Sequence, residues 1–100
     1  MSTCPTGLLS FEQVQKVMDV NGVLLAEKIT LPEQILKIKQ YIAELPTMLG
    51  APFRENVDML ALFSYRSTSF VVDFYNSCSM YIYKLDVDQT INLLKLLGSS

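Results

Sequence analysis

A chain of 100 residues, 50% hydrophobic and 18% charged, has the composition of one folded domain and is too apolar for a disordered segment. Its formal net charge of −2 comes from ten acidic and eight basic residues scattered along the chain, so it lacks the clustered cations of a nucleic-acid binder. No apolar run approaches the ~18 residues of a transmembrane helix, so we expect no membrane partner.

The sequence also lacks the usual equipment of an enzyme. It contains no histidine, which removes the commonest general base and metal ligand. Its two cysteines, Cys4 and Cys78, are far apart and form no zinc-binding pair, and its four glycines form no phosphate-binding loop. We therefore predict a protein without catalytic activity, cofactor or metal. The N-terminus has no signal-peptide pattern, so free thiols in the cytoplasm are expected.

The first predicted helix follows residues 1–8, which are expected to be a flexible leader. Ser10 and Gln13 form a capping box, and apolar residues then recur at helical spacing. Asn21-Gly22 is expected to end this helix, since both residues tolerate a left-handed backbone. The same dipeptide also favours a hairpin turn, and this alternative stays open.

The second predicted helix begins with Thr30 and Glu33 as a capping box, with Pro32 in its first turn. One apolar stripe runs along it, formed by Leu31, Ile35, Ile38, Ile42 and Leu45. Pro46 is expected to stop the helix or to kink it.

From Asp58 onward the apolar period changes to two, which predicts strands over 59–66, 69–75 and 79–85. Short polar links at Ser67-Thr68 and Ser77-Cys78 predict antiparallel hairpins. A rival interpretation extends a helix from Phe53 to Phe63, and a short helical turn at 53–56 is also compatible with the pattern.

The last predicted helix is capped by Asp86 with Gln89, and Gly98 lies just past its end. The expected element order is therefore α-α-β-β-β-α. It describes a single α+β domain over residues 9–98, in which a three-stranded antiparallel meander packs against helices in two layers.

The two faces of this meander differ in composition. With two-residue links, one face collects the aromatic side chains and is expected to be the core: Met59, Ala61, Phe63, Tyr65, Phe70, Val72, Phe74, Tyr81, Tyr83 and Leu85. On the other face, Asp73 and Lys84 are expected to pair across strands. That face also carries large apolar residues, which are the candidate partner-binding set: Leu60, Leu62, Val71, Tyr75, Met80 and Ile82.

An exposed apolar patch of more than a few hundred Å² marks a partner site, and open sheet edges also need cover. The sequence therefore predicts a small interaction domain (a regulator, an inhibitor or a chaperone-like protein) that forms a homodimer through this second face or a sheet edge. A host or regulatory protein is a further possible partner. Alternatively, one helix covers the second face, which would make three layers.

A second functional hypothesis is a small-molecule binding domain. It would have an apolar pocket between helices and sheet, lined by Phe63, Phe74, Tyr81 and Tyr83.

Overall fold

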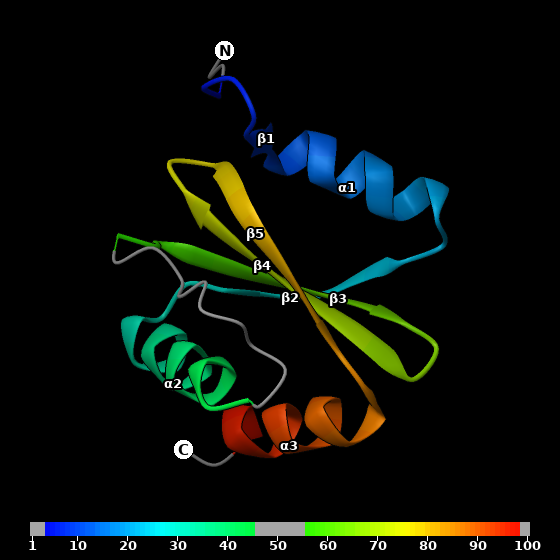
Figure 1. The fold of residues 1–100 in the computed structure, drawn as a ribbon, viewed down its shortest axis with the longest axis vertical. Coiled ribbons are helices and arrows are strands. Elements are labelled where there is room, and N and C mark those ends of the chain that lie inside the picture. The colour runs from blue at the N-terminus through cyan, green and yellow to red at the C-terminus, as the bar shows by residue number, and fades with distance from the viewer. Residues whose placement is uncertain (1–3, 46–55, 99–100) are drawn as a thin grey trace.

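The computed structural model describes residues 4–45 and 56–98. Within them, three helices flank a five-stranded antiparallel sheet of order β1-β5-β4-β3-β2 (Figure 1). The elements are β1 (Leu9–Ser10), α1 (Phe11–Val20), β2 (Leu24–Ile29), α2 (Pro32–Ala43), β3 (Met59–Tyr65), β4 (Thr68–Tyr75), β5 (Cys78–Leu85) and α3 (Val87–Gly98). The α+β class is confirmed. The expected meander is present as β3, β4 and β5, but the three-stranded sheet is wrong, because β2 and β1 extend it at its two edges.

The sheet is covered on both faces, so the two-layer arrangement is also wrong. Helix α1 lies on one face, where Val14 and Met18 pack with Phe63 and Phe74. Helices α2 and α3 lie on the other face (Figure 1), and Leu93 of α3 belongs to their core cluster. The chain therefore has two hydrophobic cores separated by the sheet. This is the three-layer alternative that the sequence left open.

The predicted helix starts are confirmed at two of three positions. Ser10 and Gln13 form a reciprocal capping box at α1. At α3, Asp86 Oδ1 accepts from the Gln89 N–H at 2.8 Å, and Gln89 Oε1 accepts from the Asp86 N–H at 3.0 Å. The predicted box at α2 is wrong: the N-cap is Leu31, whose side chain cannot cap, and Pro32 starts the helix.

The turn at Asn21-Gly22 ends α1, as predicted. Asn21 is the C-cap residue and Gly22 has φ +74°, a conformation that glycine adopts without strain. The chain then enters β2 directly, a strand that the sequence analysis did not predict. β2 lies antiparallel to β3 and carries a bulge between Leu25 and Glu27.

Both hairpin links begin one residue earlier than predicted. Tyr65 pairs with Thr68 around Arg66-Ser67, and Tyr75 pairs with Cys78 around Asn76-Ser77. Asn76 and Ser77 have φ of 50° and 65°, as a type I′ turn requires. For β3 and β4 the change moves the register by two residues, so the predicted faces of these two strands are preserved.

The rival helix from Phe53 to Phe63 is excluded from Met59 onward, where the chain is strand β3. Of the helical turn considered at 53–56, residues 53–55 lie outside the described residues.

Candidate interaction surface

The structure does not bring the six predicted partner-binding residues together. Leu60, Leu62 and Val71 are buried beneath α2 and α3. Tyr75, at the end of β4, is 38% exposed. Met80 and Ile82, on β5, are 49% and 50% exposed. The second sheet face is therefore covered by the chain's own helices, and the accessible part of the predicted set is concentrated on β5.

The four aromatic residues of the hypothetical pocket are also separated. Phe63 and Phe74 are fully buried under α1, whereas Tyr81 and Tyr83 lie on the α2 and α3 face with their ring centroids 6.0 Å apart. These residues therefore cannot line one pocket. Two hollows in the described surface lie elsewhere. One of ≈ 360 Å³, beside the start of α2, is lined by Thr30, Pro32, Ile35, Leu36, Lys39, Val57 and Asp58.

A bulge in β5 separates the residues that the sequence analysis placed together on one sheet face. On the turn side of the bulge Phe74 pairs with Ser79, and beyond it Val72 pairs with Ile82. Two residues of β5, Met80 and Tyr81, therefore lie opposite the single residue Asp73. The extra residue exchanges the faces of the rest of β5. Tyr83 consequently joins Leu60, Leu62 and Val71, and Ile82 moves to the α1 side.

The Asp73 carboxylate holds this bulge. Asp73 Oδ1 accepts from the Met80 N–H at 3.0 Å and from the Tyr81 N–H at 2.8 Å. Asp73 is fully buried, so its oxygen satisfies two amides that the bulge removes from the regular ladder. The predicted cross-strand pair with Lys84 is wrong, because Lys84 lies opposite Phe70 on the other face. An acid within the apolar β4 sequence was the available sign of this role.

Tyr83 lies close to this buried acid. Burial, reinforced by the nearby charge of Asp73 and by Tyr81, raises the pKa of the Tyr83 hydroxyl to about 12. The neutral phenol is therefore the form that the fold favours, and Asp73 and Tyr83 form a polar centre inside an otherwise apolar core.

Within residues 4–45 and 56–98, β5 is an open edge over most of its length. Its inner side pairs with β4, while β1 covers only Cys78 and Ser79 on its outer side. In the described part of the chain, no strand pairs with the outer side of residues 80–85. Since Met80 and Tyr81 both direct their N–H groups toward β4, strand alternation turns the Ile82 N–H outward. The β5 edge, defined as residues 80–85, thus offers backbone donors and acceptors beside the exposed Ile82 side chain.

A second exposed apolar line lies on α3. Val87, Ile91 and Leu94 recur at helical spacing and are 44%, 46% and 50% exposed. Thr90 and Leu93 are turned toward the sheet: Thr90 Oγ1 lies 2.7 Å from Ser69 Oγ, and Leu93 is fully buried. The exposed line is therefore a separate apolar feature on a helix, without strand-pairing groups.

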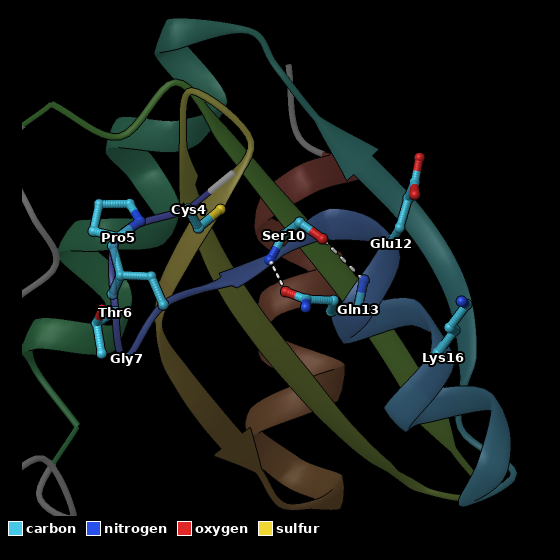
Figure 2. Close-up of a pocket in the computed structure, with 9 residues that line it drawn as sticks. Cys4, Pro5, Thr6, Gly7, Ser10, Glu12, Gln13 and Lys16 are labelled. Atoms are coloured by element: carbon cyan, nitrogen blue, oxygen red, sulfur yellow. Dashed lines mark hydrogen bonds between the residues drawn. The ribbon is translucent and has the colours of Figure 1, made fainter. Parts of the chain in front are cut away.

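The N-terminal segment is attached where the β5 edge begins. Cys4 and Cys78 form a disulfide with their Cα atoms 5.6 Å apart, so the expected free thiols are wrong. Of the expected leader, residues 4–8 are described, and this bond ties them to the second hairpin. They fold back beside the first turns of α1 and enclose a hollow of ≈ 390 Å³ (Figure 2). Cys4, Glu12 and Lys16 are among its lining residues.

Of the helices within residues 4–45 and 56–98, none combines the length and hydrophobicity needed to cross a membrane. The same stretches contain no group of three or more His, Cys, Asp or Glu side chains placed to hold a metal ion. No protein-family model, curated protein or solved structure matches the chain.

Proposed function

We propose that this protein is a non-enzymatic interaction domain that forms a homodimer by antiparallel pairing of its β5 edge with the β5 edge of a second copy. The observation that carries the proposal is the open outer side of residues 80–85 beside the half-exposed Ile82. Exposed edges of this kind add strands from a partner, and main-chain hydrogen bonds then supply much of the affinity.

A second copy fits this edge because two antiparallel strands pair about a two-fold axis. With the axis at Ile82, the Ile82 side chains of the two copies lie opposite each other, and Lys84 lies opposite the Ser79–Met80 step of the second copy, where the bulge begins. With the axis at Lys84, two ammonium groups would lie opposite each other, which is destabilising. The register centred on Ile82 therefore covers the apolar side chain and separates the like charges.

Such a dimer would be closed. Each copy uses its β5 edge in the interface, so the β2 strands of the two copies form the two outer edges of the joined sheet. β2 has a bulge and carries Glu27 and Lys28, features that disfavour further strand addition. The proposal therefore specifies a dimer and not a growing fibre.

The test is a matched pair of substitutions. Ile82→Lys places a charge at the centre of the proposed interface, and Ile91→Lys places the same charge on α3, at a site of similar exposure (50% and 46%). Sedimentation equilibrium should show a concentration-dependent dimer for the wild type and for Ile91→Lys. For Ile82→Lys the dissociation constant should rise at least tenfold, a loss of about 1.4 kcal/mol.

A third variant addresses the backbone. Strand alternation turns the Lys84 N–H outward, so Lys84→Pro should remove a donor from the interface while sparing the ladder to β4. It should also weaken the dimer. A wild type that stays monomeric throughout the concentration range, or a dimer abolished by Ile91→Lys and not by Ile82→Lys, would contradict the proposal.

We also propose that the protein is located in the cytoplasm, on the condition that the Cys4–Cys78 bond is transient there. Reducing compartments keep most thiols free, and the disulfides that occur there are usually transient. In the cytoplasm this bond would accordingly form and break during the life of the protein.

A further inference from the structure

We infer that the Cys4–Cys78 disulfide limits how much of β5 can pair with a second copy, so that its reduction lengthens the strand pairing between two copies and tightens the dimer. This inference rests on the proposed dimer and adds a means of regulating it. It follows from the position of the bond, from the few contacts that hold β1, and from the register centred on Ile82.

The disulfide lies at the start of the interface strand. Cys78 is the first residue of β5, and Cys4 lies five residues before β1. After Cys4 the chain returns along the outer side of β5, where Leu9 pairs with Ser79 and Ser10 with Cys78. A partner strand arriving from outside therefore meets an occupied position at Ser79.

The contacts that hold this segment divide into two groups. Ser10 is fixed from the α1 side, because it caps that helix and the next residue, Phe11, donates its N–H to Ser77 O at 3.1 Å. Leu9 is held by its pairing with Ser79 and by one hydrogen bond from Ser79 Oγ to its carbonyl oxygen, at 3.0 Å. Residues 5–7 are exposed and Leu8 is half-buried, so the disulfide is the main tie of residues 4–8.

Reduction would therefore release residues 4–9 and leave Ser10 in place. Short segments that are mostly exposed open locally when they lose a covalent tie. The outer side of Ser79 then becomes available. Because Met80 and Tyr81 together take one position of the strand, the outward backbone groups of Ser79 come opposite those of Lys84 of the second copy in the register centred on Ile82, and the two-fold axis creates this pair twice. The ladder thus grows from residues 80–84 to residues 79–84.

The reaction is thiol–disulfide exchange with a dithiol. A thiolate of the reagent attacks Sγ of Cys4, the S–S bond breaks, and Cys78 leaves as a thiolate that takes up a proton. The second reagent thiol then attacks the mixed disulfide, which releases the Cys4 thiolate and leaves the reagent oxidised. Cys4 is half-buried and lines the hollow of Figure 2, which is the side from which a small dithiol would approach.

The experiment measures dimer affinity by sedimentation equilibrium with and without dithiothreitol. The reduced wild type should dimerise about tenfold more tightly than the oxidised protein. The double variant Cys4→Ser, Cys78→Ser should match the reduced wild type under both conditions. Circular dichroism on each sample checks that the fold is intact.

Hydrogen exchange in the Ile82→Lys variant tests the release without dimerisation and without any cysteine substitution. On reduction, exchange of the Leu9 amide should accelerate at least tenfold, while that of Phe74, in the fully buried part of β4, should not change.

The outcomes separate the two proposals. An oxidised dimer whose affinity is unchanged or weaker on reduction would overturn the disulfide inference and leave the β5 interface standing. Equal exchange rates for Leu9 in the oxidised and reduced states would overturn the inference in the same way. A wild type that is monomeric in both states would overturn the interface and the inference together.

Discussion

The two edges of the sheet, at β2 and at β5, differ in how they are protected from the addition of another strand. β2 at one edge is bulged between Leu25 and Glu27, and most of its side chains are exposed. β5 at the other edge is also bulged, but a buried carboxylate, Asp73, holds its extra residue. Charged side chains protect the β2 edge, whereas the two-residue strand β1 covers only Cys78 and Ser79 of β5 and leaves the β5 edge open.

This difference shows that a bulge alone does not close an edge. At β2 the bulge lies next to Glu27 and Lys28, so an arriving strand would have to desolvate charges. At β5 the bulge contains Met80 and moves the half-exposed Ile82 side chain to the α1 side of the sheet. The same backbone irregularity therefore protects one edge and shapes an apolar contact on the other.

The largest effect is expected from removing the anchor of the β5 bulge. Asp73→Ala leaves the Met80 and Tyr81 amides without their acceptor inside the protein, and each such buried donor costs roughly 1–3 kcal/mol. We expect the free energy of unfolding, measured by urea denaturation, to fall by about 3 kcal/mol. Using the Ile82→Lys background keeps dimerisation out of this measurement.

Asp73→Asn is the matched control, because an amide oxygen in the same place can still accept both N–H groups. It should lose about 1 kcal/mol or less, and the difference between the two variants measures the anchoring. Equal losses in both variants would show that charge, and not acceptance from Met80 and Tyr81, is what Asp73 contributes.

A smaller effect at the same centre is expected from pH. The Tyr83 pKa is about 12 in the fold and about 10 in the unfolded chain, so the native state holds this proton more tightly. The contribution to stability is complete below pH 10 and is lost as the pH rises from 10 to 12. Over that interval the free energy of unfolding should fall by about 1–2 kcal/mol from this group.

Tyr83→Phe provides the control, since it removes the titrating hydroxyl and keeps the ring. The informative quantity is the wild-type slope minus the slope of the variant, because that difference isolates the Tyr83 hydroxyl. Identical slopes for the two proteins would mean that burial does not shift the Tyr83 pKa.

The course of β3, β4 and α3 could be predicted from the sequence because period-two and helical patterns are local. The position of α2 on the second face could not be predicted, because the apolar stripe around Ile38 does not show which face of the sheet it contacts. β2 was missed because an edge strand with a bulge has no regular alternation: its burial runs exposed, intermediate, three exposed and buried from Leu24 to Ile29.

The candidate surface was half predicted for a similar reason. Met80 and Ile82 were identified from their apolar side chains, but their grouping with Leu60 assumed an unbroken ladder. One extra residue opposite Asp73 exchanges the faces beyond it, and the sequence signals it only through the acid within the apolar β4. The Cys4–Cys78 bond was missed because 74 residues separate the two sulfurs in the chain, and only the fold brings them together.

The smallest effect is expected at the β2 edge. The Lys28 ammonium lies 4.3 Å from the centre of the Phe11 ring, so this edge charge also stabilises the contact between β2 and α1. Lys28→Met keeps the aliphatic stem and removes the charge, and it should lower the free energy of unfolding by about 0.5 kcal/mol. Lys28→Arg, which retains the cation over the ring, should lose less.

The same variant shows whether the two edges are independent. Lys28→Met leaves the bulge and Glu27 at the β2 edge, so the dimer dissociation constant should equal that of the wild type. Species larger than a dimer in sedimentation velocity would mean that this single lysine keeps the β2 edge closed. In that case the contrast between the edges would depend on one charge and not on the whole strand.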